Sequence, residues 1–341
     1  MTTLYNNWAN GATNPEQYAM LGMIERAEAE MVTEIAFDTK PIKRKTGRSA
    51  AFSRWGVPAT NTTAHAEGIN NAARNLVPED VFCTVSEYSE TFSYSSLADD
   101  TDPRDYAEGA AEVGHDLVKL DNTALNWALM IGGTQKFFNS SSITARTDVN
   151  GPITAGRLEK AYTLLRNAKA KTFAELQLGS NKIGSSGIMP SYLVFGSEYL
   201  RGDFRNCAGF KGINEYPGNV TVSPFEVGAI DRGRIILSPE LTPVADAGAT
   251  VGSANLRSTT GTSADVFPIV VVGKNALGHV PLKGDGKYGS GNLRVYLIKD
   301  PDRTDPANLT RLWTAAWTAG RLILNELWIA RIEVACTNNH T

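Results

Sequence analysis

The chain has 341 residues, of which 42% are hydrophobic and 20% are charged, and its formal net charge is −3. This apolar content is enough for a large core in one or two domains, and the weak charge disfavours a dedicated nucleic-acid-binding protein, which usually has a strong basic excess. Three widely spaced cysteines do not indicate a disulfide framework. The N-terminus lacks the pattern of a signal peptide, and no apolar run is long enough to span a bilayer. We therefore expect a soluble protein made in a cytoplasm.

The N-terminal region is predicted to be a loose segment followed by a helix. Residues 1–13 are polar, and Asn14-Pro15 opens a predicted helix that runs to about Thr33. Its apolar side is formed by Met20, Met23, Ile24, Ala27 and Met31. Residues at this spacing share one face of a helix, so the segment is expected to be amphipathic.

A basic cluster follows the predicted N-terminal helix. It consists of Lys40, Lys43, Arg44, Lys45 and Arg48. The simplest interpretation is a solvated arm. The alternatives are a contact with the acidic face of a neighbouring subunit and a contact with phosphates.

Residues 49–96 are predicted to be extended and hairpin-like. Side chains from Val81 to Tyr94 alternate between two faces, which predicts one strand of roughly 45 Å. Residues 52–57 are the expected partner strand, across the small-residue segment 59–75. An isolated two-stranded ribbon is marginally stable in water, so we expect another copy of the chain to cover this one.

The apolar spacing from Asp102 to Asn139 predicts a long helix of roughly 45 Å, with Asp102 as N-cap and Pro103 at the first helical position. The predicted buried stripe consists of Tyr106, Ala110, Val113, Leu117, Leu120, Ala124, Trp127 and Ile131. The predicted solvent face consists of Glu108, Glu112, His115, Lys119, Asn122 and Asn126. Such a rod needs a sheet or a second element along its stripe. A coiled coil is the alternative.

A second helix is predicted over 154–173, and residues 191–299 have the pattern of a mixed α/β region. Strands are expected at 191–195, 234–237, 266–272 and 293–298. Residues 245–264 are poor in apolar side chains and are predicted to be a loop. After a polar linker at 300–306, the arms 312–324 and 328–334 predict a C-terminal antiparallel hairpin.

The sequence contains no recognisable catalytic or metal-binding motif. Its four histidines, His65, His115, His279 and His340, are scattered singly. Gly284-x-Gly286-x-x-Gly289 matches the dinucleotide pattern, but no helix is predicted after it. No nucleophile stands beside a base. We therefore expect no enzymatic activity, no cofactor and no metal, and keep an enzyme of unknown type in the α/β region as an alternative.

The order of the predicted parts, together with several co-linear motifs, resembles the Hong Kong 97-type capsid fold of tailed-phage major capsid proteins. It looks most like the coat proteins of N-four-like podophages. The matching motifs are Arg44-Lys45-x-Gly47, Ala64-x-Ala66-Glu67-Gly68, Thr84-Val85-x-x-Tyr88, Asp102-Pro103, Tyr192-Leu193-Val194, Phe225 to Ile230, Val272-Gly273-x-x-Ala276-Leu277-Gly278, Asp300-Pro301 and the Trp317/Ala319 region.

This resemblance implies an α+β chain with five parts. They are an N-terminal arm (1–48), an extended loop (49–97), a peripheral domain (98–174) with a spine helix (102–139), a mainly axial domain (175–299), and a C-terminal hairpin (300–341) that returns to the peripheral domain. Members of the family assemble as pentamers and hexamers into icosahedral shells around double-stranded DNA. The implied partners are other copies of the chain, scaffolding and portal proteins, a decoration protein and packaged DNA. The implied location is the virion, after assembly in the host cytoplasm.

The resemblance places subunit contacts in the arm and the extended loop. The candidate contact residues are Lys43, Arg44, Lys45, Arg48, Phe52, Trp55, Glu67, Phe82, Tyr88, Phe92 and Tyr94. Aromatic side chains dominate interface energetics, although packing within the chain is the alternative for each of them. A bacterial nanocompartment shell, which has the same fold and encloses an enzyme, is the main alternative function. A tail-tube or surface-layer protein is another.

Overall fold

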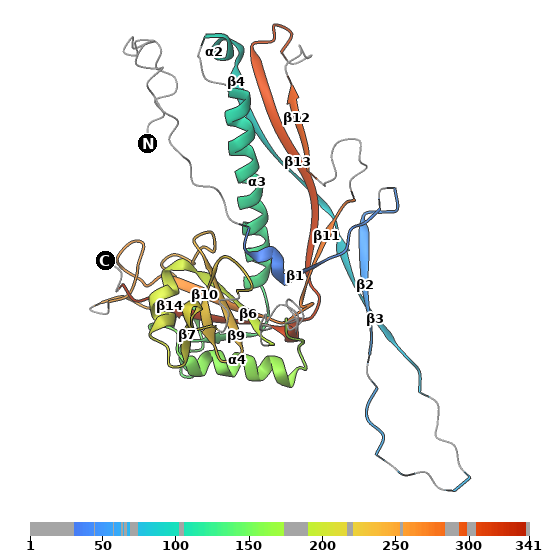
Figure 1. The fold of residues 1–341 in the computed structure, drawn as a ribbon, viewed down its shortest axis with the longest axis vertical. Helices are drawn as coiled ribbons and strands as arrows, with labels where there is room; N and C mark the ends of the chain where they lie inside the picture. The colour runs from blue at the N-terminus through green and yellow to red at the C-terminus, as the bar shows by residue number, and fades with distance from the viewer. Residues whose placement is uncertain are drawn as a thin grey trace, which may run out of the picture.

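The computed structural model describes residues 31–43, 45–56, 58–62, 64, 67–68, 74–101, 106–173, 190–216, 221–252, 255–283, 293–298 and 305–338. The molecule is elongated, with a compact body, a long helix backed by a β ribbon, and a projecting hairpin (Figure 1). Nearly all of the predicted N-terminal helix, and the predicted N-cap Asp102 with Pro103, lie outside the described residues.

The body is built on a seven-stranded mixed sheet with the order β5-β14-β10-β6-β9-β8-β7. The strands are β5 (Lys136–Phe138), β6 (Tyr192–Ser197), β7 (Phe210–Gly212), β8 (Glu226–Ile230), β9 (Gly233–Ser238), β10 (Val266–Val272) and β14 (Ile329–Ala335). Every residue of β10 is buried. A strand covered on both faces needs such a continuous apolar run, so the strand predicted at 266–272 is confirmed.

Both faces of the body sheet are covered by helices. On one face α4 (Ala155–Asn167) buries Leu158, Ala161 and Leu165 completely. The predicted helix was expected to reach Phe173 but ends at Asn167, because Lys169 adopts a left-handed conformation (φ 57°). On the other face lies the end of the long helix α3 (Tyr106–Ile131). This packing anchors the rod in the body.

The ribbon is a five-stranded sheet organised around β13 (Thr310–Ile323). Along β13, β4 (Ser86–Ser95) pairs on one side and β12 (Arg294–Ile298) on the other. Further along, β11 (Leu277–Pro281) joins β13, and β1 (Phe37–Thr39) pairs with β11 in parallel. The ribbon therefore combines segments from both ends and the middle of the chain.

The predicted C-terminal hairpin is wrong, because β13 and β14 pair in different sheets. A turn containing the 3-10 helix η8 (Glu326–Trp328) carries the chain from the ribbon into the body. The alternation of apolar residues with Arg331 and Glu333 was typical of a half-exposed arm. Instead β14 lies between β5 and β10 inside the body sheet, and Glu333 is buried.

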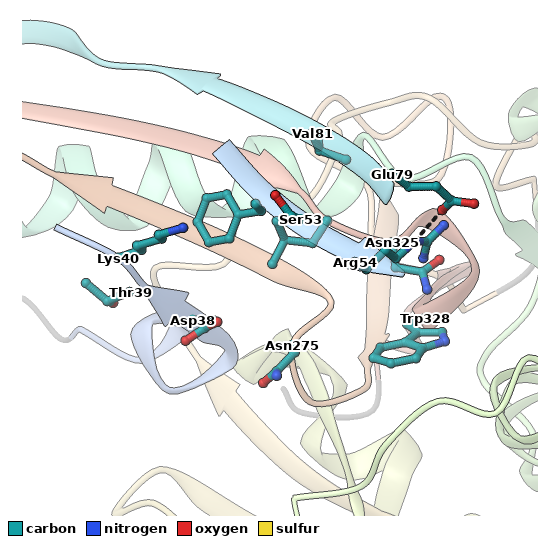
Figure 2. A pocket seen from close by; sticks show the side chains of 12 residues that line it. Asp38, Thr39, Lys40, Ser53, Arg54, Glu79, Val81, Asn275, Asn325 and Trp328 are labelled. Atoms are coloured by element: carbon teal, nitrogen blue, oxygen red, sulfur yellow. Dashed lines mark hydrogen bonds and ion pairs between the residues drawn. The ribbon is translucent and has the colours of Figure 1, made fainter. Parts of the chain in front are cut away.

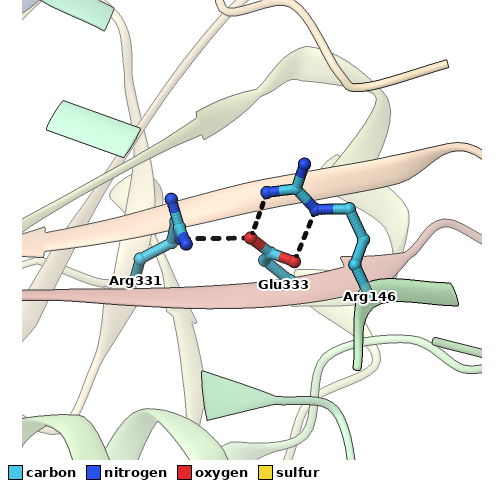
Figure 3. Close-up of polar contacts among 3 residues, drawn as sticks. All are labelled: Arg146, Arg331 and Glu333. Carbon is cyan, nitrogen blue, oxygen red and sulfur yellow. Dashed lines mark hydrogen bonds and ion pairs between the residues drawn. The ribbon is translucent and has the colours of Figure 1, made fainter. Parts of the chain in front are cut away.

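Glu333 is accommodated by two arginines (Figure 3). Its carboxylate accepts hydrogen bonds from Nε and Nη2 of Arg146 at 2.9 and 2.6 Å, and Nε of Arg331 lies 3.1 Å from Oε1. Burial opposes ionisation of Glu333, but the hydrogen bonds from Arg146 and the charges of both arginines outweigh it and lower the pKa of this carboxyl. The ion pair between Arg146 and Glu333 connects the segment around Arg146 to strand β14 of the body sheet.

The single strand predicted from Val81 to Tyr94 is two strands. β3 (Pro78–Thr84) pairs with β2 (Ser49–Trp55) in the projecting hairpin, whereas β4 leaves the hairpin and pairs with β13 along its whole length of ten residues. The division falls at Val85, whose N–H donates to Arg48 O and whose carbonyl accepts from Arg48 Nε, both at 2.9 Å. Period-2 alternation continues through this break, so the pattern does not reveal it.

The helix α3 lies against the ribbon through one very close contact. A Cβ atom at Gly114 would lie 2.0 Å from the Trp313 indole, so only glycine permits this approach. Trp313 and Trp317 are themselves held by Phe92 and Tyr88 of β4, at ring-centroid distances of 5.7 and 5.9 Å. Large side chains on the sheet thus meet a small residue on the helix.

For this reason the predicted stripe of α3 is only partly correct: Trp127 is buried and Ala110 packs in the cluster of Val118 and Trp313, but the middle of the stripe does not face the ribbon. The helix presents Gly114 and Val118 to the ribbon, roughly a quarter of a turn away from Val113 and Ala124, which are exposed. Asn126, predicted to face solvent, is buried. The helix also ends at Ile131, eight residues before the predicted Asn139, and β5 follows it.

A polar junction joins α3, the ribbon and η3 (Thr33–Ala36). Arg321 of β13 donates to Asn126 Oδ1 at 2.5 Å and to Asn122 Oδ1, and Asn126 Nδ2 donates to Thr33 Oγ1 at 3.1 Å. His279 lies directly opposite Arg321 in the antiparallel ladder. Burial and the Arg321 charge lower the pKa of His279 to about 4.

Replacing Gly114 with alanine is expected to destabilise the subunit by about 1–3 kcal/mol, because the new methyl group overpacks the contact with Trp313. Gly109→Ala on the same helix is the matched control, since nothing lies within 4 Å of its Cβ position. It should instead stabilise the helix by roughly 0.5–1 kcal/mol. Urea unfolding of the unassembled subunit measures both values, and equal effects of the two variants would contradict the contact.

Acidification is expected to destabilise the subunit through His279. The unfolded chain, with the ordinary pKa of 6.5, binds this proton before the folded chain does, so stability falls as the pH decreases from 6.5 through about 4. His279→Gln should flatten this part of the pH profile of the melting temperature, whereas His115→Gln, at an exposed position, should leave it unchanged. An unchanged slope in His279→Gln would refute the assignment.

Candidate functional site

The projecting hairpin presents large apolar side chains to solvent. Trp55 is 66% exposed and Phe82 is 68% exposed, and Leu76 and Val77, just before β3, are also uncovered. An ion pair between Arg54 Nε and Glu79 Oε2, at 2.6 Å, links the two strands near this end. Exposed aromatics on a thin ribbon are unfavourable in water, so these residues are suited to contact another molecule.

The other predicted aromatic residues pack within the chain. Phe52 is half-buried beside the small cluster at the base of the hairpin, with Lys40 Nζ 5.2 Å from its ring centroid. Tyr88 and Phe92 lie on the two tryptophans of β13, and Tyr94 stacks on Tyr106 at 5.7 Å. Their predicted contacts with other subunits stay predictions.

The basic cluster and Glu67 lie on the surface. Lys43, Lys45 and Arg48 are exposed at the base of the hairpin, and Arg44 lies outside the described residues. Lys45 has a positive φ of 64°, which turns the chain toward β2. Glu67 is exposed in the segment that joins β2 to β3. These charged side chains are accessible, but the structure does not bring Glu67 together with the basic cluster.

The strand β12 is a candidate interaction surface that the sequence patterns did not single out. Among the described residues it pairs only with β13, and Val295, Tyr296, Leu297 and Ile298 are 41–51% exposed. A short apolar run of this kind is typical of a buried strand, so the predicted strand is confirmed but its exposure was not expected. An edge strand with free backbone groups is a template for pairing with another chain.

A cleft of about 440 Å³ lies between the paired strands β2 and β3 and the turn that follows β13 (Figure 2). Charged side chains of both signs line it, including Asp38, Lys40 and the Arg54–Glu79 pair, together with Trp328. None of its lining residues is a histidine or a cysteine. This mixture suits contact with a polar segment of a protein.

Apart from His279 in the ribbon, the strongly perturbed titratable groups belong to contacts within the body. Buried Glu226 accepts hydrogen bonds at 2.9 Å from Arg234 Nη1 and from the Tyr216 hydroxyl, and burial together with the Glu226 charge raises the pKa of Tyr216. Burial and the Asp203 charge raise the pKa of Cys336 to about 12, so its thiol stays protonated at neutral pH.

The described part of the chain has neither a cluster of metal ligands nor a membrane-spanning helix. No group of three or more His, Cys, Asp or Glu side chains there could hold a metal ion. No helix there is long and apolar enough to cross a membrane. The exposed apolar surfaces of the hairpin and β12 are therefore the best candidates for a functional site.

Sequence comparison finds one informative relative. No family model matches the chain. The major capsid protein of Pseudomonas phage KPP21 is 26% identical over 243 residues, which cover 67% of this chain and 59% of the relative. The match thus spans less than two thirds of the relative's length. The predicted placement among N-four-like phages stays a prediction.

Structural comparison finds the same architecture in phage capsids. The capsid of Ralstonia phage GP4 has a TM-score of 0.64 at 10% identity, covering 94% of this chain and 95% of that one. The capsid of cyanophage Pam1 has a TM-score of 0.61 at 10% identity (93% and 95%), and the head of Helicobacter pylori bacteriophage KHP40 has 0.59 at 11% identity (96% and 98%). The chain therefore has the Hong Kong 97-type fold of tailed-phage major capsid proteins, as its sequence predicted.

Proposed function

We propose that the chain is a major capsid protein, which assembles with identical copies into the closed shell of a phage particle. One observation carries the proposal: the hairpin and β12 project away from the body and expose apolar side chains that the chain itself does not cover. In a shell of identical subunits, neighbouring copies cover these surfaces.

In the proposed mechanism, the chain acts through its contacts with neighbouring subunits. The hairpin and the β12 edge are different surfaces, so contacts that join them to neighbours are heterologous and form closed rings when the rotation between copies allows it. Pentamers and hexamers are the proposed rings, and a few aromatic anchors carry most of the energy of each contact. A structural role without enzymatic activity agrees with the mixed-charge cleft and with the buried ion pairs, which hold strands together.

The proposed partners and location follow from this role. Scaffolding and portal proteins guide assembly in the host cytoplasm, a decoration protein binds the finished shell, and double-stranded DNA fills the virion. The exposed Lys43, Lys45 and Arg48 provide a surface for an acidic neighbour or for DNA phosphates. The proposed contact with DNA phosphates is independent of the DNA sequence.

The nanocompartment alternative has less support. The curated relative and the similar solved structures described above are phage capsid proteins. Purified shells that contain phage DNA and no co-purifying enzyme would separate the two functions in favour of the phage capsid.

Replacing Trp55 and Phe82 with serine together should block assembly and leave the subunit folded. Both side chains are exposed, so the melting temperature of the isolated subunit should stay close to that of the wild type. Loss of an aromatic anchor costs about 2 kcal/mol or more at each contact, which moves shell formation to at least tenfold higher protein concentration. Light scattering and electron microscopy measure this shift.

The matched control is Leu327→Ser, which removes an exposed apolar side chain from the turn between β13 and β14. It should assemble at concentrations near those of the wild type. Normal shells from the Trp55/Phe82 double variant would contradict the proposed role of the hairpin.

A further inference from the structure

A second cleft, of about 460 Å³, lies at the base of the hairpin, where the segment before β2 meets the junction of β3 and β4. Two cations, Lys45 and Arg48, line it together with the apolar side chains of Val85 and Leu282. Val85 is buried and Leu282 is half-buried, whereas both cations are exposed. The cleft therefore has an apolar floor and a basic rim.

The rim has more positive charge than the chain neutralises. Glu87, the acidic residue of the lining, is in an ion pair with Arg294 of β12. Nε of Arg48 donates to the carbonyl oxygen of Val85 at 2.9 Å, and neither Arg48 nor Lys45 has a carboxylate partner among the described residues. The cleft can thus accept a carboxylate from outside the chain.

Lys45 adopts a backbone conformation that is unfavourable for lysine, with a φ of 64°. Lys169 has a similar φ of 57°, but it follows the C-terminal end of α4, where a cation is attracted to the free carbonyl groups of the helix. Lys45 lies between β1 and β2, so this explanation does not apply to it. Such an outlier suggests that the side chain of Lys45 has a role.

The hairpin carries a carboxylate whose surroundings match the cleft. Asp80 of β3 is exposed and lies two residues from Phe82, so both point to the same face of the strand. The register of the hairpin places Trp55 of β2 on this face too. Asp80 has no ion-pair partner among the described residues. The face therefore combines an unpaired carboxylate with two exposed aromatic side chains.

Asp80 is too far from the cleft of its own chain to enter it. Asp80 and Ser86, which lines the cleft, are six residues apart along β3 and β4, a distance of about 20 Å in extended strands. A second copy whose hairpin lies over the base of the first hairpin brings the two groups together. This contact is heterologous, as closed rings of identical subunits require.

We propose that Lys45 and Arg48 bind the carboxylate of Asp80 from the hairpin of a neighbouring copy. The inference rests on the proposed capsid function and adds the charged contact that positions the hairpin. DNA phosphate is the other anion to weigh. A DNA duplex presents a row of phosphates, which the Glu87 carboxylate repels, and it offers no apolar side chain to the floor of the cleft.

The variant Lys45→Asn tests the contact, with Lys169→Asn as the matched control. Each removes one positive charge at a positive φ, which asparagine adopts more readily than lysine, so both unassembled subunits should melt no lower than the wild type. Lys45→Asn should form shells only at about fivefold higher protein concentration, measured by light scattering, and Lys169→Asn at wild-type concentrations. Equal assembly of the two variants would overturn the proposal.

Charge reversal tests the identity of the partner. Asp80→Lys and Lys45→Glu should each assemble more poorly than Lys45→Asn, and the double variant should assemble at concentrations at least threefold lower than either single variant needs. A double variant no better than the single ones would contradict the pairing. Normal shells of Lys45→Asn that hold less DNA would overturn it as well, because the cleft would then bind DNA.

The wild-type chain separates this proposal from the capsid function on which it rests. If wild-type shells form and the Lys45 variants behave like Lys169→Asn, only the pairing with Asp80 is wrong. If the wild-type chain forms no shells under any assembly condition, both the pairing and the capsid function are overturned.

Discussion

The contact between Gly114 of α3 and Trp313 of β13 sets the distance between the long helix and the ribbon. With a methyl group at position 114, the helix would have to move off the sheet, and the aromatic layer of Trp313, Trp317, Tyr88 and Phe92 would lose its cover. At its other end the helix is held in the body through Trp127 and Met130. The helix is therefore held by the ribbon at one level and by the body at another.

The two sheets differ in how much of their apolar surface a single chain buries. The body sheet is covered on both faces, and even its charged residue Glu333 is paired. Among the described residues, α3 covers one side of the ribbon, and both the β12 edge and the hairpin expose apolar side chains. Burial of apolar surface is the main favourable term in folding and in association, so the surface left over by folding is available for assembly. A stable body with an incomplete ribbon suits a subunit of a larger shell.

Sequence patterns correctly predicted the elements whose buried residues follow a clear local apolar pattern. The continuous apolar run of β10 and the helical spacing of Leu158, Ala161 and Leu165 in α4 identify a buried strand and an amphipathic helix without further information.

The face of α3 was misplaced because its partner carries two tryptophans, so the closest approach falls on Gly114 rather than on leucines. The β13–β14 hairpin and the unbroken Val81–Tyr94 strand were wrong because pairing between distant strands, which depends on the whole fold, is not encoded in their alternation. For the candidate site, the exposed Trp55 and Phe82 were anticipated, whereas the exposure of β12 was not, since an apolar run is the same whether a strand is central or at an edge.

The central claim is that identical copies complete the surfaces that one chain leaves open. Hydrogen exchange measured by mass spectrometry, on the unassembled subunit and on purified shells, tests it most directly. We expect the amides of β2, β3 and β12 to exchange quickly in the subunit and to become strongly protected in the shell, while those of β10 are protected in both. Equal protection of the hairpin and β12 in the two states would contradict the claim.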